Sequence, residues 1–420
     1  MINIETQSRE QRKVESAFQE RHFSRLKRNI VLLYLIRGIS SIHFFGSVMI
    51  LFFEEWGGIS FADIMILEAI FTGGIFFLEI PTGTVADKYS RRLSLILSYF
   101  VNIIAVLVYI SYPSFLVFAA GELIWALSVA LNSGASDAFL YDSLVELHQD
   151  HHSKKYFAQM QSIGLITMIL GSMSGGFIAA QFGLRATMLY SAIPLVISFF
   201  LSLFLEEPKT HQASRKERAW VIFIKGWKNI RKSLSLQRLI ADSVVLSVIA
   251  YYILWIWQKR VMVLELDIQW FGIVHSSMIL AQVVVLAVFR PLERWLEKRG
   301  WQKAKILVLR ATGLGTGVGF ILMGVFQSIE VVLVGIIIGA GFGLSRRVIL
   351  SNYMQKHIES EQRATTISTV SMIRMLLLLI LNPIVGQAVE WNMNATLIIL
   401  GAIAVLWSVF NRLRQSDLHE

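Results

Sequence analysis

Four charged residues lie inside apolar stretches that are long enough to cross a lipid bilayer: Arg37, Glu68, Glu122 and Arg374. A charge near the centre of a membrane costs about 2.5–3.5 kcal/mol on insertion scales, so charges that are kept there point to a function. Burial disfavours the ionised form of a carboxyl, and a neighbouring arginine restores it. We therefore expect Glu68 or Glu122 to carry a coupling proton. Arg37 or Arg374 would then restore the ionised form of that carboxyl. The alternative is a set of static Arg–Glu pairs that only fix helix packing.

Other polar and aromatic residues are weaker candidates. Tyr251 and Tyr252 lie in one apolar stretch and are candidates to line a substrate cavity; the alternative is an anchor at the membrane interface, where Tyr and Trp are enriched. Glu79 and Asp242 fall near the inner interface, where we expect structural roles. The His-rich stretch 148–152 has no second group of ligands, so we interpret it as a solvated loop and expect no metal site. The chain has no cysteine, which excludes thiol chemistry and disulfides.

The stretches that hold these residues indicate a helical membrane protein. Of the 420 residues, 55% are hydrophobic and 16% are charged. Segments such as Leu93–Tyr112 and Val331–Leu344 contain no charge, and about 20 apolar residues cross a bilayer as a helix. The chain has about twelve such segments, the first expected over 29–53. We predict an all-α polytopic membrane protein with twelve transmembrane helices in two pseudo-symmetric six-helix bundles.

A long polar stretch divides these spans six and six. Within it, Ala219–Leu234 alternates apolar and basic residues in a pattern typical of an amphipathic helix on the inner membrane surface. Two six-helix halves around a central loop are typical of many secondary transporters. The predicted units are a cytoplasmic N-terminal tail (1–28), an N-terminal six-helix bundle (29–205), a cytoplasmic linker (206–236), a C-terminal six-helix bundle (237–411) and a cytoplasmic C-terminal tail (412–420).

The basic residues indicate an orientation. The net charge is +10, which could suggest nucleic acid as a partner. Most of the 39 Lys and Arg, however, fall in one set of loops and in the two tails, whereas Arg185, Lys259 and Arg260 fall in the other set. By the positive-inside rule the first set is cytoplasmic. The surplus therefore predicts cytoplasmic termini and contact with anionic lipid, and excludes a nucleic-acid-binding face.

The charged turn Gly83–Arg92 resembles the helix 2–3 loop motif of the major facilitator superfamily, usually written G-x-x-x-D-R-x-G-R-R. The matching residues are Gly83, Asp87, Arg91 and Arg92. Lys88 stands where the motif has its first arginine, and Ser90 stands where it has its second glycine. The segments 78–82 and 133–144 resemble one bacterial branch of that superfamily. With the twelve-span layout, the resemblance covers nearly the whole chain.

The resemblance implies a conformational latch on the cytoplasmic side. In that family the motif's acid faces the N-terminus of span eleven, where free N–H groups and the helix dipole favour an anion. Thr365 lies at that start here, and Arg91 is expected to pair with Asp142 at the end of span four. The cluster would lock the two halves together when the outer side is open. The alternative is a solvated turn that obeys the positive-inside rule. The expected latch residues are Gly83, Asp87, Lys88, Arg91, Arg92, Asp142 and Thr365.

A glycine-rich stretch in span five resembles the G-P-x-x-G-G motif of the superfamily's drug/proton antiporters. It consists of Gly171, Gly175 and Gly176, with Ser172 where the motif has proline. Small residues let helices approach closely and bend, which a rocking transporter needs, although any tight helix pair uses the same residues. The antiporters' basic residue in span four, followed by glycine, is absent: Ala120 precedes Gly121.

These features predict a secondary active transporter that moves a small organic solute by alternating access, driven by the proton gradient without a cofactor. We expect a monomeric antiporter for efflux of a drug-like or amphipathic compound, in a bacterial inner membrane. The alternative within the class is a proton-coupled importer of a sugar, organic acid or peptide. The alternative from another class is a membrane-embedded enzyme, for which no Ser/His/Asp grouping is apparent. The chain lacks an ATP-binding P-loop motif.

Overall fold

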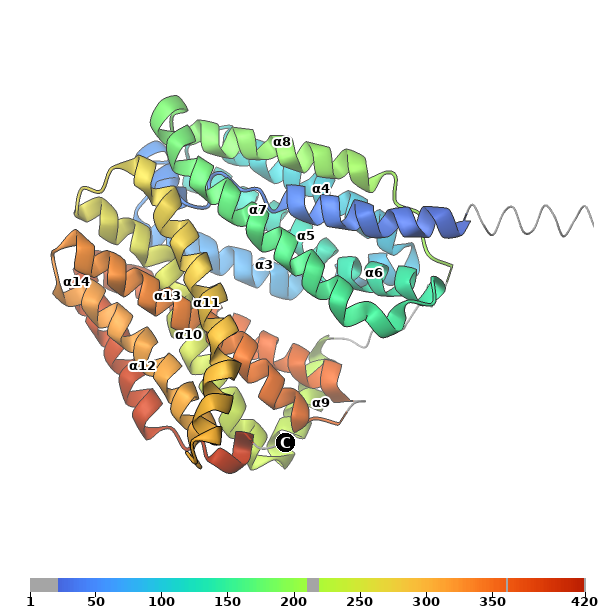
Figure 1. The fold of residues 1–420 in the computed structure, drawn as a ribbon. Coiled ribbons are helices and arrows are strands. Elements are labelled where there is room, and N and C mark those ends of the chain that lie inside the picture. Colours follow the sequence, from blue (N-terminus) through green and yellow to red (C-terminus); the bar gives the residue numbers. More distant parts are fainter. Residues whose placement is uncertain (1–21, 210–218, 360–361, 419–420) are drawn as a thin grey trace, which may run out of the picture.

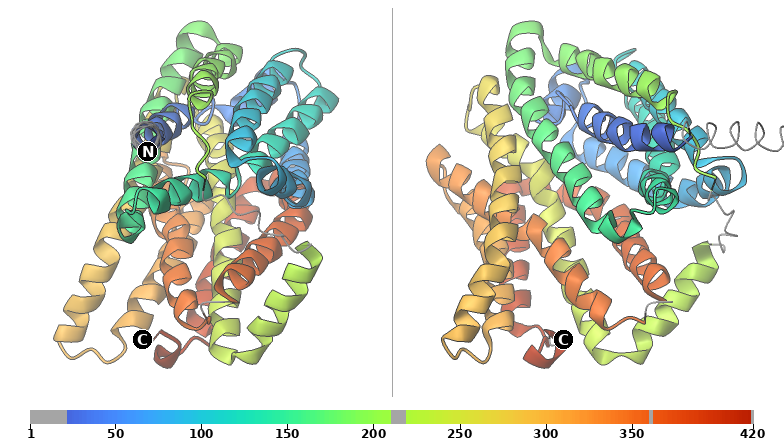
Figure 2. Two further views of the ribbon diagram at one scale, coloured as in Figure 1. Left: turned by 90° about the vertical axis from the view of Figure 1, so that its right-hand side faces the viewer. Right: turned by 45° about the vertical axis from the view of Figure 1, so that its right-hand side comes forward.

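The protein consists of two helical bundles that lie side by side (Figures 1 and 2). The computed structural model describes residues 22–209, 219–359 and 362–418. Within these residues it contains helices and turns but no strand. A membrane interior offers no water to backbone N–H and C=O groups, so segments that cross it satisfy these groups within helices.

The N-terminal bundle contains six membrane segments, two of which are broken. Gly134 interrupts the fourth segment, where its φ of 73° is a left-handed conformation that glycine adopts without strain. The elements in order are a helix over 22–40, α2 (Met49–Leu51), a π-helical turn (Phe52–Trp56), α3 (Phe61–Lys88), α4 (Arg91–Tyr109), α5 (Phe115–Asn132), α6 (Ala135–Glu146), a 3₁₀ turn (Asp150–His152), α7 (Ser153–Phe182) and α8 (Leu184–Ser202).

The first membrane segment differs from the continuous span expected over 29–53. Its helix is present from residue 22, within the expected tail, and unwinds over 41–48. Non-helical backbone at membrane depth is tolerated only where protein or water satisfies it. Here the Phe44 N–H donates to Ser191 Oγ at 3.0 Å, and the Gln258 side chain of the other bundle donates to the Gly46 carbonyl at 3.1 Å.

The C-terminal bundle contains the other six membrane segments. Its last two expected spans form one long helix, α14, with a kink at Asn392, whose φ of −159° and ψ of 98° are not helical. The elements in order are α10 (Leu234–Val263), a 3₁₀ turn (Ile268–Trp270), α11 (Phe271–Lys298), α12 (Ala304–Val325), α13 (Ile329–Lys356), α14 (Arg363–Phe410) and a 3₁₀ turn (Gln415–Leu418).

The predicted twelve-helix architecture is confirmed. Ten helices in the described part of the chain are long and apolar enough to cross a membrane. One of them, α14, holds two spans, and the broken segment over 22–56 supplies the remaining one. Between the bundles, α3 packs against α14 and α7 packs against α11.

The two sides of the molecule differ in how closely the bundles approach. We call the side that holds residues 22 and 418 the terminus side, and the opposite one the far side. The bundles meet near their far-side ends and spread apart toward the terminus side, where α6 and α9 (Ala219–Lys232) lie away from each other (Figures 1 and 2). The helix α9 is the amphipathic linker helix that the sequence predicts, and it packs against α14 and α10.

The C-terminal tail folds back onto α10. Asp417 accepts a hydrogen bond from the Ser235 hydroxyl at 2.6 Å and lies 3.5 Å from the Arg238 guanidinium. Burial opposes ionisation of Asp417, but these contacts and a hydrogen bond from the Arg414 N–H outweigh it and lower its pKa. The tail is therefore part of the C-terminal bundle.

A buried ion pair holds the centre of the C-terminal bundle together. The Arg346 guanidinium binds the Asp242 carboxylate, and both side chains are almost fully buried. Asp242 also accepts bonds from Trp407 Nε1 at 3.2 Å and Asn411 Nδ2 at 2.8 Å. The pair thereby joins α10, α13 and α14, which agrees with the structural role expected for Asp242.

We expect Asp242→Asn to destabilise the protein by about 3–5 kcal/mol, because it leaves the Arg346 charge buried without a counter-ion. Unfolding in detergent micelles, followed by tryptophan fluorescence, measures this loss. Asp150→Asn, in an exposed turn, is the matched control. A double variant, Asp242→Asn with Arg346→Gln, should recover part of the stability. Equal stability of Asp242→Asn and Asp150→Asn would contradict the assignment.

Candidate transport site and gates

A hydrogen bond between the bundles centres on Glu68. The Tyr251 hydroxyl on α10 donates to Glu68 Oε2 on α3 at 2.7 Å. Glu68 is 5% exposed and lies about two helical turns from the far-side end of α3. An ionised carboxylate accepts such a bond more strongly than a neutral one. The protonation state of Glu68 therefore affects the contact between the bundles.

Several polar atoms around Glu68 lack partners. Glu122 on α5 is 2% exposed and close enough to Glu68 for their charges to repel each other. Glu122 interacts with the nearby Tyr109 hydroxyl, and Asn382 on α14 interacts with Tyr251. The Glu122 Oε1 atom, the Tyr109 hydroxyl and both amide atoms of Asn382 are nevertheless buried without a partner at hydrogen-bond distance among the described residues. Each unpaired buried group costs about 1–3 kcal/mol. We call Glu68, Glu122, Tyr251 and Asn382 the acidic cluster.

The two intramembrane arginines take different places. Arg37 donates to Gln161 on α7 at 3.1 Å, within its own bundle. Arg374 on α14 interacts electrostatically with Tyr251, and thereby lies beside the acidic cluster. Neither arginine forms an ion pair with Glu68 or Glu122 in this conformation, as far as the described residues show. Of the two arginines expected to reset the glutamates, Arg374 is thus the better placed.

The two tyrosines have separate environments. Tyr251 belongs to the acidic cluster, whereas Tyr252 is 1% exposed and its hydroxyl has no partner among the described residues. Their ring centroids are 5.6 Å apart in an edge-on arrangement. Tyr252 therefore packs inside the C-terminal bundle, and only Tyr251 reaches the other bundle.

The expected latch residues lie at the terminus side. Arg91 binds the Asp142 carboxylate and donates to the Ala138 carbonyl at 3.1 Å. The Glu207 carboxylate, which the sequence did not single out, accepts from the Arg91 and Arg92 N–H groups at 3.0 and 2.8 Å. It therefore caps α4, together with Ser90.

The remaining latch residues are only partly placed. Gly83 lies buried in α3. Asp87 and Lys88 also lie in α3, but their side chains are outside the described ones. At the start of α14, a Cβ added to Gly226 of α9 would lie 3.0 Å from the Thr365 carbonyl oxygen. The linker helix therefore packs against the end of span eleven where the resemblance expects a motif acid.

The span-five glycines admit the unwound first segment. A Cβ added to Gly171 would lie 2.9 Å from the backbone nitrogen of His43, and one added to Gly175 would collide with the Phe44 carbonyl. Gly176 meets the other bundle, since its Cβ would lie 2.7 Å from the Ile268 carbonyl oxygen. The helix α7 continues through all three glycines. The non-helical stretch lies instead in the neighbouring first segment, over 41–48, and bending of span five at these glycines stays a prediction.

A charged cluster joins the bundles at the far side. Lys259 Nζ on α10 lies 2.6 Å from Glu54 Oε1 and 3.1 Å from Glu390 Oε1. Glu390 on α14 also accepts from the Phe61 N–H at 2.8 Å. We call Glu54, Lys259 and Glu390 the far-side gate. Lys259 stood out in the sequence as one of few basic residues on its side, but its partners are distant along the chain and could not be deduced.

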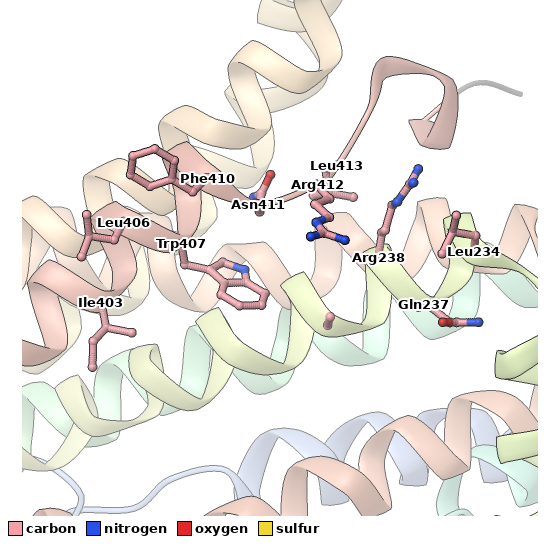
Figure 3. A pocket seen from close by; sticks show the side chains of 11 residues that line it. Leu234, Gln237, Arg238, Ile403, Leu406, Trp407, Phe410, Asn411, Arg412 and Leu413 are labelled. Atoms are coloured by element: carbon pink, nitrogen blue, oxygen red, sulfur yellow. The ribbon is translucent and has the colours of Figure 1, made fainter.

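Two large grooves are present in the described part of the protein. One, of about 790 Å³, is lined by mainly apolar residues of α3, α5 and α14, including Ile70 and Leu123, and runs next to the acidic cluster. The other, of about 680 Å³, lies between α10 and the end of α14 (Figure 3). Its exposed Leu406 and Phe410 place it on the outside of the C-terminal bundle, and its lining shares no residue with the acidic cluster.

Comparison with known proteins identifies the family. The sequence profile of the Major Facilitator Superfamily matches residues 30–383. The chain belongs to the Major Facilitator Superfamily. It is therefore a membrane transporter rather than an enzyme, as the sequence predicts. Over 158 residues it is 23% identical to YxaM, an uncharacterized MFS-type transporter of Bacillus subtilis (strain 168). This match spans 38% of the chain and 39% of the length of that relative.

Solved structures of superfamily transporters share the fold. The nucleoside transporter NupG has a TM-score of 0.71 at 15% identity, covering 92% of this chain and 97% of that one. A POT family transporter in complex with 5-aminolevulinic acid also has a TM-score of 0.71, at 14% identity, covering 94% and 97%. A bacterial homolog of the human lysosomal transporter Spinster, inward-facing and unoccupied, has 0.72 at 12% identity, covering 94% and 98%. At these identities the likeness concerns the fold alone.

We expect Lys259→Gln to weaken the far-side gate, because Glu54 and Glu390 then repel each other without a cation between them. A loss of 1–2 kcal/mol raises the population of far-side-open molecules roughly 5- to 30-fold. Ala62→Cys is the reporter, since Ala62 is 4% exposed, contacts Gly386 across the bundles, and the chain has no other cysteine. Its labelling rate with a water-soluble maleimide should rise in Lys259→Gln. The control Lys305→Gln, at a terminus-side ion pair, should leave the rate unchanged. Equal rates in both variants would contradict the gate.

Proposed function

We propose that the protein is a proton-coupled secondary transporter that exports an amphipathic organic compound. The observation that carries this proposal is the acidic cluster. It holds two buried carboxyls that repel each other, and one of them accepts a hydrogen bond from the opposite bundle. Two such carboxyls favour binding of one proton between them. No cofactor enters the proposal, because the gradient drives the cycle.

Coupling would follow from the Glu68–Tyr251 bond. While Glu68 is ionised, it holds the bond to Tyr251 and favours contact between α3 and α10. Protonation weakens this bond, so the bundles separate more readily there. It also removes the repulsion from Glu122, which lies in the same bundle as Glu68 and thereby favours uptake of the proton. A proton can shift the conformational equilibrium only if its binding free energy differs between the two conformations. The acidic cluster supplies this difference at the contact itself.

The proposed orientation places the terminus side in the cytoplasm of a bacterial inner membrane. The excess of Lys and Arg in the terminus-side loops supports it. In that orientation the closed far-side gate and the spread terminus side correspond to an inward-open state of a monomer. The Spinster homolog of similar fold is described as inward-facing. The Arg91–Asp142 pair and Asp87 would then form the latch that closes the cytoplasmic side when the gate opens.

Export of an amphipathic compound is supported by the apolar groove next to the acidic cluster. It opens between α3, α5 and α14, and Phe77 at its edge is 66% exposed. A compound dissolved in the bilayer could approach the cluster along it. Import of a sugar, organic acid or peptide is the alternative direction, and it would use the same carboxyls.

We expect Glu68→Gln to abolish proton coupling. Cells with and without the protein are first compared for drug susceptibility and solute accumulation, with and without an uncoupler. Uncoupler-sensitive resistance supports efflux, and uncoupler-sensitive accumulation supports import.

The compound found is then applied to proteoliposomes, where wild-type protein should evoke a pH change and Glu68→Gln none. Tyr251→Phe removes the hydroxyl but leaves the Glu68 carboxyl in place, so this variant should still evoke the pH change, at a lower rate. Glu330→Gln, at an exposed far-side turn, is the control, and an unaltered pH change in Glu68→Gln refutes the assignment.

We expect Asp87→Asn to reduce transport at least roughly tenfold while membrane insertion stays intact, because a neutral side chain loses its attraction to a helix N-terminus. Transport is measured in proteoliposomes and insertion by the yield of protein in membranes. Asp150→Asn, which removes an exposed acid of the same side, should transport normally. Wild-type transport by Asp87→Asn would rule out the latch role.

A further inference from the structure

A small cavity opens between helices of the C-terminal bundle, on the terminus side of the acidic cluster. It has a volume of about 90 Å³, which holds several water molecules, since about 10–15 Å³ of such volume holds one. Three helices, α10, α13 and α14, line it. Its polar lining consists of Ser243, Ser247, Arg347, Ser351, Ser371 and Arg374.

The two arginines of this cavity, Arg347 exposed and Arg374 partly buried, have no counter-ion among the described residues. Their charges repel each other, and among the described residues neither Arg347 nor Arg374 has a hydrogen-bond or ion-pair partner. Arg374 lies eleven residues into α14, about 16 Å along the helix at 1.5 Å per residue. Arg346, next in the chain to Arg347, has its Asp242 partner. The bundle thus pairs one of these arginines internally and leaves the other two facing a cavity.

This lining is suited to an anion. Guanidinium groups match carboxylate, phosphate and sulfonate groups through two parallel hydrogen bonds. Serine hydroxyls rotate and can donate to the same oxygens. The rest of the lining is apolar and includes Val244, Met354 and Val370, which suits the apolar body of an amphipathic molecule.

We propose that Arg347 and Arg374, with the cavity serines, form the binding site for the negatively charged head of an organic anion. The proposal rests on the proposed transport function and adds the substrate class. The cavity adjoins the acidic cluster, because Arg374 interacts with Tyr251 and Tyr251 binds Glu68. The substrate is therefore an amphipathic acid, with its charged head in the C-terminal bundle near the coupling carboxyls.

Binding to the purified full-length protein tests this site without requiring transport. The probes are 2-naphthoate, 2-naphthalenesulfonate and the cation 2-naphthylmethylammonium, which share one ring system. Titration calorimetry in phosphatidylcholine nanodiscs should show binding of both anions and none of the cation. Arg347→Gln and Arg374→Gln should each weaken anion binding at least roughly tenfold, as expected for a lost charged hydrogen bond. Arg374→Lys, which keeps the charge, should recover part of it.

Arg310→Gln is the matched control, since Arg310 lies six residues into α12 from the terminus side and outside the cavity lining. It should bind both anions as the wild type does. Each variant must unfold within a few degrees of the wild type, which separates a lost site from a lost fold. Equal anion binding in all variants, or equal binding of the cation, overturns the proposal.

Two further experiments distinguish a lipid head group from a free organic anion, and the anion site from proton coupling at Glu68. Nanodiscs with phosphatidylglycerol test a lipid phosphate as the anion: competition that requires Arg347 and Arg374 supports the site and assigns it to a lipid head. If anion binding depends on both arginines but the Glu68→Gln variant still moves protons, this site is supported and the proposed coupling is refuted. The converse result, coupling through Glu68 without anion binding, refutes this site alone.

Discussion

The absence of water in the membrane interior is the constraint on which the rest of this structure depends. It requires the backbone to satisfy its own polar groups, which gives the helices, and it makes every unpaired charge costly. Asp242 meets this constraint with Arg346, and Glu54 and Glu390 meet it with Lys259. Against this background, the acidic cluster and the surroundings of Arg347 and Arg374, where polar groups lack partners among the described residues, are places where mobile species are expected.

Both proposed binding sites use the same two helices. Ser243, Ser247 and Tyr251 recur every four residues along one face of α10, and Arg374 and Asn382 are eight residues apart on α14. A proton at Glu68 and an anion at Arg374 would therefore act on the same pair of elements. Whether the two sites fill together or alternately decides whether the solute moves with the proton or against it.

The sequence predicted the membrane segments well, because apolar blocks of bilayer length leave few alternatives. It placed Glu68 and Glu122 at membrane depth, and it matched Arg91 with Asp142 through a family motif. It missed the unwound stretch 41–48, which contains no proline and is satisfied by side chains distant along the chain, such as Gln258. It missed the Glu207 cap for the same reason. Such contacts follow from tertiary packing, which no local pattern encodes.

The linker is anchored at both ends. Glu206 and Asn29 exchange hydrogen bonds of 2.8 and 2.9 Å, and the Lys209 N–H binds Glu146, so residues up to 209 belong to the N-terminal bundle. The helix α9 is packed on the C-terminal bundle through Gly226 and Thr369. An extended chain spans at most about 3.3–3.6 Å per residue, so residues 209 and 219 cannot be more than about 36 Å apart. The length of the chain between these residues would thereby limit how far the two bundles can move apart in any transport cycle.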